Sequence, residues 1–236
     1  MLGYIFFAKK QTIHYKYALL GTEIERVNQV KDLGVILDSQ LTFKPHISFT
    51  VDKASRVLGF IFRIAKDFTN IYCLKSLYCA LSRSILEYCS VVWTPHYNNG
   101  VERIESVQRR FLRFALRKLP WTDRFRLPSY ESRCLLIRLE LLSVRRETAR
   151  ALFTTDLLQG RIDCPALLEQ VNINVRPRAL RNNSMLRLPA QRTNYGIFGA
   201  MVGLQRLFNR VSALFDFNLP RTLLRRRYRL FFSRSD

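Results

Sequence analysis

Four arginines on one side of a segment with helical periodicity are the residues in this sequence best suited to bind phosphate. They are Arg103, Arg110, Arg113 and Arg117. At 100° per residue they fall within an arc of roughly 80°, opposite a mostly apolar side. A planar guanidinium can donate to two phosphate oxygens at once. We call this set the arginine stripe, and its spacing predicts a helix with one buried and one phosphate-binding face. The alternative is a solvated basic face that Glu102 and Glu105 partly neutralise.

The overall charge of the chain favours a polyanionic partner. The 236 residues contain 39 Lys plus Arg against 18 Asp plus Glu, a formal net charge of +21. A folded domain with this much self-repulsion usually binds nucleic acid; an anionic membrane surface and a merely soluble basic protein are the alternatives. The further candidates for phosphate binding are Arg56, Arg63, Arg225, Arg226 and Arg227. The tail 225–229 is typical of a nuclear localisation signal, a nucleic-acid patch or a solvated terminus.

Residues that could carry out catalysis are much less evident. Two-metal phosphoryl transfer needs carboxylates close enough to share ions about 4 Å apart, and no two Asp residues are adjacent in this chain. Asp32 and Asp38 flank a predicted strand and are expected to lie about 20 Å apart. None of the three His residues stands in a recognisable arrangement with Cys or Ser, and the sequence has no glycine-rich phosphate loop. The sequence therefore predicts a binding protein without catalytic residues, a metal site or a cofactor.

The cysteines and the hydropathy pattern predict an intracellular chain that does not enter the membrane. The five cysteines match no disulfide framework and no zinc pattern, so we expect reduced thiols, most of them in the core. No segment reaches the roughly 18 uninterrupted apolar residues that span a bilayer. Met1–Ala8 is apolar but short and ends at two lysines, which favours a strand over a signal peptide.

The elements that must position these residues change character near residue 44. Upstream of it are short runs rich in branched and aromatic residues, with a turn expected at Gly21-Thr22. These runs are Leu2–Ala8, Ile13–Leu20, Ile24–Val27 and Leu33–Leu37. They predict a small antiparallel sheet.

From Pro45 onward, apolar residues recur at helical spacing. The first buried face is expected to consist of Ile47, Val51, Ala54, Leu58, Ile61 and Ala65. The second is expected to consist of Ile71, Leu74, Tyr78, Leu81, Ile85 and Tyr88. Later helices are expected at Val101–Leu119, Ser129–Leu142, Val144–Leu158, Val202–Phe215 and Pro220–Phe232. Gly160 is a predicted helix stop, and residues 161–197 are predicted to form an extended basic segment.

One stretch of the sequence resembles a known protein family. Residues 30–43, Val-Lys-Asp-Leu-Gly-Val-Ile-Leu-Asp-Ser-Gln-Leu-Thr-Phe, closely resemble the segment that follows the catalytic palm in LINE-type reverse transcriptases of the Jockey and CR1 kind, which non-LTR retrotransposons encode. The likeness continues in order at residues 46–47, 84–88, 91–95, 104–113, 135–146, 160–163, 193–196 and 208–209. It covers nearly the whole chain, and the order and spacing of the pieces make it specific.

The resemblance implies a role for each part of the chain. In that family the Leu-Gly-Val strand belongs to the primer grip, the hairpin that holds the primer end against the active site. This role maps to Leu33, Gly34 and Val35, and the following helices map to the thumb, which packs along the template–primer duplex. The family polymerises DNA with a Tyr/Phe-x-Asp-Asp motif, which the resemblance places upstream of Met1. We therefore expect no polymerase activity from this chain.

The combined prediction is a mainly α fold, a thumb-like helical bundle preceded by a small antiparallel hairpin or sheet left over from the palm. The expected domains are a palm remnant with the primer-grip-like hairpin (1–43), the thumb-like domain (44–160) and a basic C-terminal region with short helices (161–236). The expected function is sequence-tolerant binding of RNA or an RNA–DNA duplex in the nucleus, with the palm and fingers of the parent polymerase as a further partner. The alternatives are a translated remnant of a decayed element without function and a basic helical interaction protein.

Overall fold

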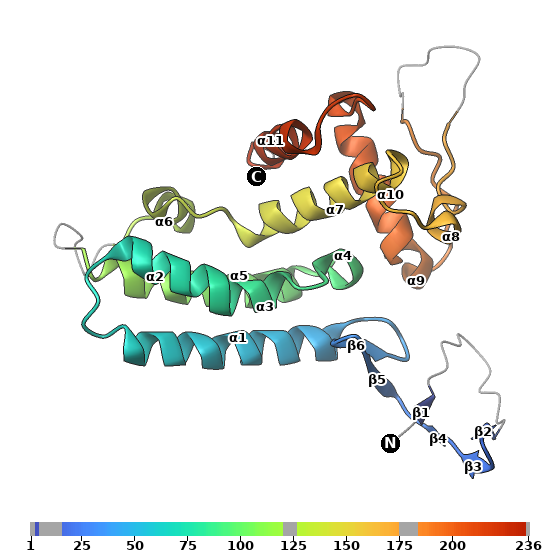
Figure 1. Ribbon diagram of the computed structural model, residues 1–236, viewed down its shortest axis with the longest axis horizontal. Helices are drawn as coiled ribbons and strands as arrows, with labels where there is room; N and C mark the ends of the chain where they lie inside the picture. The colour runs from blue at the N-terminus through green and yellow to red at the C-terminus, as the bar shows by residue number, and fades with distance from the viewer. Residues whose placement is uncertain (1–2, 5–15, 120–126, 175–183, 235–236) are drawn as a thin grey trace.

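The computed structural model describes residues 3–4, 16–119, 127–174 and 184–234, and it is mainly helical (Figure 1). Short strands precede the helices, as the sequence predicts, but they form three separate pairs and not one sheet. The pairs are β1 (Gly3–Tyr4) with β4 (Glu25–Arg26), β2 (Ala18–Leu19) with β3 (Thr22–Glu23), and β5 (Gln29–Asp32) with β6 (Val35–Asp38). The first pair is parallel and the other two are antiparallel hairpins. Parts of the predicted strands Leu2–Ala8 and Ile13–Leu20 lie outside the described residues.

Both hairpins close through two-residue turns in the left-handed region of the backbone. The turn residues are Leu20 (φ 50°) and Gly21 (φ 79°) in one hairpin, and Leu33 (φ 43°) and Gly34 (φ 85°) in the other. Two positive φ angles in succession match the twist of the paired strands. The turn predicted at Gly21-Thr22 is therefore wrong by one residue, and Leu33 belongs to a turn and not to the predicted strand.

The second turn also corrects the expected separation of two acids. Asp32 pairs with Val35 across the hairpin, so Asp38 lies only three residues farther along the partner strand. At the rise of a strand this is roughly 10 Å, and not the 20 Å of a continuous strand. Asp38 is nearly buried and accepts hydrogen bonds from the Thr42 and Phe43 amides at 3.1 and 2.8 Å. Its carboxylate therefore shapes the loop before the first helix.

Helix α1 (Lys44–Ile64) confirms the first predicted buried face. Pro45 lies in its first turn, where the missing N–H has no helical partner to lose. All six residues of the predicted face are buried against the rest of the molecule. Arg56 and Arg63 are exposed on the opposite side, as the helical spacing predicts.

The next helical stretch confirms only part of the second predicted face. It consists of α2 (Ile71–Leu77), a π-helical turn (Tyr78–Arg83), α3 (Ser84–Glu87) and α4 (Ser90–Trp93). Leu74 and Tyr78 are buried, but Leu81 and Tyr88 are 40% and 54% exposed. The wider π turn carries more residues per turn than an α-helix and moves the buried face along the chain by one position. Ser82 and Leu86 are buried as a result.

The helices that follow begin and end close to the predicted positions, with one exception. They are α5 (Asn98–Leu116), α6 (Tyr130–Ile137) and α7 (Leu142–Leu158). The helix predicted to run to Leu142 ends at Ile137, because Arg138 adopts a left-handed conformation (φ 54°) and turns the chain toward α7. Gly160 has φ 68° and follows the end of α7, in agreement with its predicted role as a stop.

The C-terminal region is more helical than the sequence predicts. Its helices are α8 (Pro165–Leu168), α9 (Asn194–Ile197), α10 (Ala200–Val211) and α11 (Arg221–Phe232). A short 3-10 turn follows α10. Within the segment 161–197, which was expected to be extended, α8, α9 and an isolated bridge between Ile173 and Leu186 are formed. Residues 175–183 of that segment lie outside the described part of the chain.

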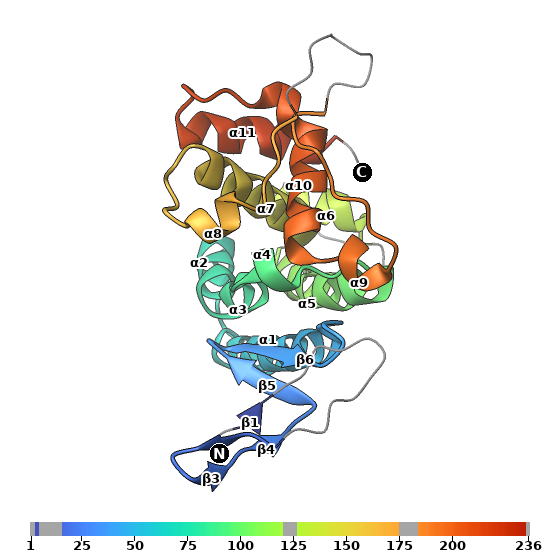
Figure 2. The same cartoon turned by 90° about the vertical axis from the view of Figure 1, so that its right-hand side faces the viewer.

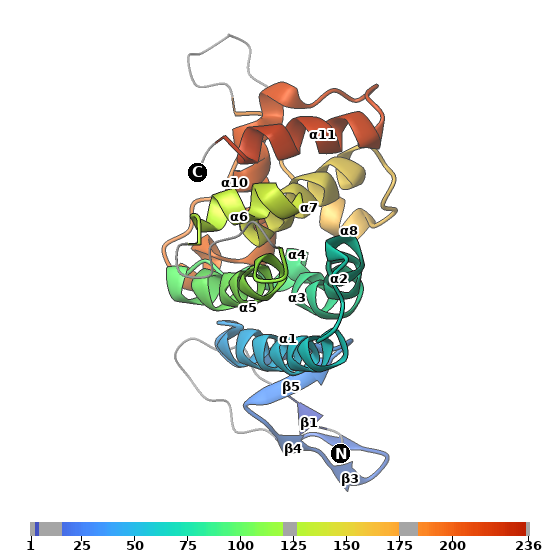
Figure 3. The same ribbon diagram turned by 90° about the vertical axis from the view of Figure 1, so that its left-hand side faces the viewer.

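The helices stack in layers over two hydrophobic clusters. Figures 2 and 3 show the strands, α1, the layer of α2, α3 and α5, then α7, and finally α11 in succession. Tyr78, Trp93 and Phe111 fill the first cluster, between α1 and the start of α7. Phe208 and Tyr228 fill the second, between α7, α10 and α11. Helix α7 thus contributes to both clusters. The domain boundaries predicted at residues 43 and 160 remain predictions.

Candidate nucleic-acid interface

Helix α5 presents the arginine stripe on its solvent side. Its other side is buried along its length, with Ile104, Phe111 and Ala115 fully enclosed. All four arginines of the stripe are exposed, and Arg117 directly follows the last helical residue. The exposure that the spacing predicts is therefore confirmed. Among the described residues, Arg110, Arg113 and Arg117 form no ion pair and no side-chain hydrogen bond, whereas Arg103 donates to the Ser48 hydroxyl at 2.8 Å.

The two glutamates of α5 do not neutralise the stripe. Glu102 pairs with Arg109, and the distance from Arg109 Nη1 to the Glu102 carboxylate is 2.5 Å. The Arg109 guanidinium also lies over the Tyr130 ring. This pair lowers the pKa of Glu102 below its ordinary value. Glu105 is 4% exposed and points into the molecule. The two acids that could have balanced the stripe are thus engaged elsewhere.

Glu105 joins α5 to the start of α7. Its carboxylate accepts hydrogen bonds from the Leu142 and Ser143 amides at 3.3 and 2.7 Å, which are among the free N–H groups of a helix N-terminus. It also accepts from the Tyr130 hydroxyl at 2.5 Å and from Arg146 Nη2 at 3.4 Å. Burial and then this carboxylate raise the pKa of Tyr130 far above its ordinary value. No pattern in the sequence predicts this buried role of Glu105.

Gln108 adds a second polar connection on the buried side of α5. Its side-chain amide accepts from the Tyr78 hydroxyl at 3.0 Å and donates to the Glu140 carbonyl at 2.8 Å. It is fully buried, so unmet hydrogen bonds here would be costly. Together, Glu105 and Gln108 fix α5 to three other elements and hold the arginine stripe on a rigid support.

Helices α1 and α5 run side by side in the same direction. Three contacts along their length establish this: Arg103 with Ser48, Phe114 stacked on Phe62 at 4.2 Å, and Lys118 donating to the carbonyls of Ala65 and Lys66. Arg56 and Arg63 on α1 therefore belong to the helix next to the stripe. The exposed Arg225, Arg226 and Arg227 lie on α11, on the other side of the helical stack (Figures 1 and 2). The predicted arginines thus fall on two separate surfaces.

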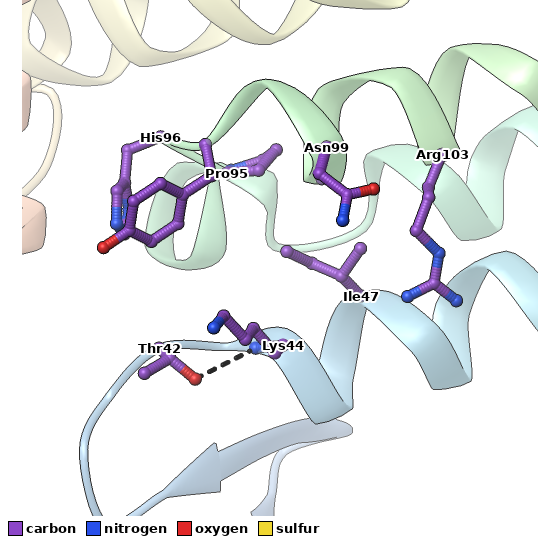
Figure 4. Close-up of a pocket in the computed structure, with 9 residues that line it drawn as sticks. Thr42, Lys44, Ile47, Pro95, His96, Asn99 and Arg103 are labelled. Carbon is purple, nitrogen blue, oxygen red and sulfur yellow. Dashed lines mark hydrogen bonds between the residues drawn. The ribbon is translucent and has the colours of Figure 1, made fainter.

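A cavity of about 320 Å³ adjoins the N-terminal end of α5 (Figure 4). Arg103, a member of the stripe, lines one end of it and His96 lines the other, and Tyr97 is also part of the lining. The ring of His96 stacks on Phe198 at 4.1 Å, and Lys44 Nζ lies 5.7 Å from the centre of the Tyr97 ring. Sequence reasoning did not identify this aromatic and basic group. Its one local signal is the pair His96-Tyr97 directly before the helix start.

Two features of this cavity follow from local chemistry. A Cβ atom at Gly100 would lie 2.9 Å from Cβ of Pro95, so a larger residue would force the helix start and the preceding loop apart. Burial and then the charge of Lys44 lower the pKa of His96 below its ordinary value, so the imidazole is neutral at neutral pH. The cavity therefore takes its positive charge from Lys44 and Arg103.

Of the residues predicted to belong to a primer grip, Leu33 and Gly34 form the turn of the β5–β6 hairpin and Val35 is the first residue of β6. Val35 is buried in the first cluster, while Leu33 is 81% exposed at the turn. The Tyr88 hydroxyl donates to the Leu33 carbonyl at 2.9 Å, and a Cβ at Gly34 would lie 3.3 Å from the Tyr88 ring. A glycine suits this position because of both its positive φ and this close approach. The hairpin is thus fixed against the helical bundle.

Several predicted absences can be examined only in the part of the chain that the structure describes. There, no three or more His, Cys, Asp or Glu residues come together as a possible metal site. The helices of the described ranges are too short or too polar to cross a lipid bilayer. All five cysteines are free, but only Cys134 is buried. The prediction that most cysteines lie in the core is wrong: Cys73 is exposed on α2, and Cys89 is exposed directly before α4.

Protein-family models, curated proteins and solved structures give no match to this chain. The resemblance to LINE-type reverse transcriptases therefore stays a prediction from the sequence.

Proposed function

We propose that the chain binds an RNA or RNA–DNA duplex through its arginine stripe, without sequence preference. The observation that carries the proposal is that Arg110, Arg113 and Arg117 are exposed and, among the described residues, unpaired. Some arginines elsewhere in the molecule form ion pairs instead, among them Arg145, Arg146 and Arg221. A row of guanidinium groups without counter-ions, in a chain of net charge +21, is suited to bind phosphates.

The length of the stripe fits a nucleic-acid backbone. From Arg103 to Arg117 the helix advances about 21 Å at 1.5 Å per residue. This distance is long enough to contact several successive phosphates of one strand, which lie about 3.4 Å apart along the axis even in B-form DNA. Helix α1 contributes Arg56 and Arg63 but also the exposed Asp52, so α5 presents the more uniformly basic face.

The proposal includes an origin for the chain in a LINE-type reverse transcriptase. The primer-grip-like hairpin comes first, and the helices that would form the thumb follow directly, which is the order that the resemblance implies. In this proposal the palm and fingers of the parent polymerase are a second partner, and the chain itself performs no polymerisation. The basic run Arg225–Arg227 supports a location in the nucleus.

The salt dependence of binding tests the proposal. We expect the affinity of the full chain for an RNA–DNA duplex, measured by fluorescence anisotropy, to fall with salt with a log–log slope near −4 for four phosphate contacts. Arg110→Gln combined with Arg117→Gln should reduce the slope by about two units and weaken different sequences equally, because phosphate contacts carry no base information.

A matched control removes the same charge from another surface. Arg161 and Arg206 are also exposed and, in the described part of the chain, unpaired, so Arg161→Gln with Arg206→Gln should leave the slope close to that of the parent. If both double variants change the slope equally, binding is diffuse and the stripe is not the interface.

A further inference from the structure

A second polar cavity lies between α3, α4, α7 and α11, and the arginine stripe is outside its lining. Its volume is about 330 Å³. The charged residues that line it are Arg145, Arg146, Arg225, Arg229, Glu87 and Glu140. Four arginines facing two glutamates give the cavity a basic lining. Volumes near this value are typical of small-ligand pockets.

The ion pairs around the cavity leave positive charge in excess. Arg145 donates to Glu87 and to Glu140, and Arg229 pairs with Glu140 as well. Arg83 lies 3.8 Å from Glu87, and Glu105 lies 3.4 Å from Arg146. Within the described residues, the lining and its ion-pair partners thus contain five arginines and three glutamates. Arg225 is exposed and forms no ion pair among the described residues.

Two buried groups of the lining have unused hydrogen-bonding capacity. Arg146 is 2% exposed, and its Nη1 has no hydrogen-bond partner among the described residues. Thr148 is 4% exposed, and its hydroxyl is likewise without a partner there. Leaving such groups unsatisfied destabilises a folded protein. Both residues belong to the lining of the basic cavity, and guanidinium and hydroxyl groups are donors suited to a tetrahedral oxyanion.

We propose that this cavity binds a phosphate group, with Arg146, Thr148 and Arg225 as its donors. The phosphate can come from free inorganic phosphate or from the terminal phosphate of a nucleic-acid strand. This inference does not rest on duplex binding by the arginine stripe, because the two sites share no residue. Arg110→Gln with Arg117→Gln should therefore leave binding at this cavity unchanged.

Thermal unfolding of the full chain tests the site, with inorganic phosphate as the probe. Phosphate is titrated against chloride at constant ionic strength, so that screening does not change. We expect the unfolding temperature to rise and to saturate, because the ligand binds only the folded state. The proposal is overturned if phosphate gives no saturable rise beyond chloride.

Two neighbouring arginines provide a matched pair of variants. Arg225→Gln removes one charged donor from the cavity and should weaken phosphate binding about tenfold. Arg226→Gln makes the same change at the next residue, which is also exposed but does not line the cavity, and should retain the parental affinity. Equal losses in the two variants would mean non-specific attraction and would overturn the site.

Thr148→Val separates a binding role from a structural one. Valine has the shape of threonine but no hydroxyl, so it removes the unsatisfied group. We expect the variant to unfold at a higher temperature than the parent without phosphate, and to bind phosphate more weakly. Unchanged phosphate affinity would contradict the assigned donor. If this variant fails to fold, the Arg225→Gln and Arg226→Gln pair still decides.

Oligonucleotides distinguish the two sources of phosphate. A 5′-phosphorylated strand and a 5′-hydroxyl strand of the same sequence are compared in the parent and in Arg225→Gln. If the parent prefers the phosphorylated strand severalfold and the variant does not, a strand end supplies the phosphate. If the two strands bind alike while inorganic phosphate still saturates the cavity, the ligand is the free anion.

Discussion

Replacing Glu105 by glutamine tests whether the buried carboxylate holds the helical layers together. The substitution preserves the shape of the side chain but removes its charge. Arg146, which is 2% exposed, then keeps a buried positive charge without its counter-ion. The Leu142 and Ser143 amides at the start of α7 also lose a charged acceptor.

The expected loss of stability is large for a single conservative substitution. Removing one partner of a buried ion pair costs about 3–5 kcal/mol, mainly because the remaining charge is uncompensated. The amide oxygen of glutamine can still accept hydrogen bonds, which places the expected loss of unfolding free energy at about 3 kcal/mol, the lower end of this range. Urea unfolding followed by circular dichroism measures it, and the midpoint should move without a change in m-value.

Glu102→Gln provides the control on the same helix, one turn earlier. Glu102 is exposed and its pair with Arg109 is solvated, so the unfolding midpoint should remain close to that of the parent. If Glu105→Gln is as stable as Glu102→Gln, the carboxylate does not join α5 to α7 in the way described. A double variant with Arg146→Met should recover part of the loss, because it removes the isolated charge.

Three further predictions concern single residues. Gly34→Ala should lower the unfolding free energy by about 1–2 kcal/mol, since alanine disfavours a φ of 85°; an unchanged urea midpoint would contradict this. Burial raises the pKa of Cys134 to about 11, so iodoacetamide at neutral pH should label Cys73 and Cys89 first; mass spectrometry that finds Cys134 labelled at the same rate would refute it. The pKa of His96 is lower in the folded chain than in the unfolded chain, so the unfolded chain binds more protons as the pH falls through the ordinary imidazole value. His96 should therefore reduce the free energy of unfolding below that pH, and an NMR titration that gives His96 a pKa of 6.5 or higher would contradict this sign.

The long helices could be predicted because their packing is periodic. In α1, the six residues at helical spacing are all buried, since one straight helix presents one face to the core. The same reasoning placed Leu81 in the core of the next stretch and was wrong there. The π-helical turn between α2 and α3 changes the number of residues per turn. A prediction that assumes 3.6 residues per turn throughout cannot anticipate such a change.

The candidate site was predictable where it depends on one helix and not where it depends on several. The exposure of Arg110 and Arg113 follows from their position on α5 alone. The cavity at the helix start is lined by Lys44 and His96, and the His96 ring also stacks on Phe198; these three residues come from three distant parts of the chain. These residues come together only because of how α1, α5 and the segment before α10 pack, and their spacing in the sequence does not predict this packing.

The position of Glu105 connects the stability of the fold with the charge of its surface. Read along the sequence, Glu105 lies between Arg103 and Arg110 and could balance either of them. In the folded chain its carboxylate is turned inward, where it binds the start of α7 and the buried guanidinium of Arg146. An acid that stabilises the core is thereby absent from the outer face of α5. The basic character of the arginine stripe is therefore a consequence of how α5 is attached to the core, and Glu105→Gln should weaken the fold without making the stripe more basic.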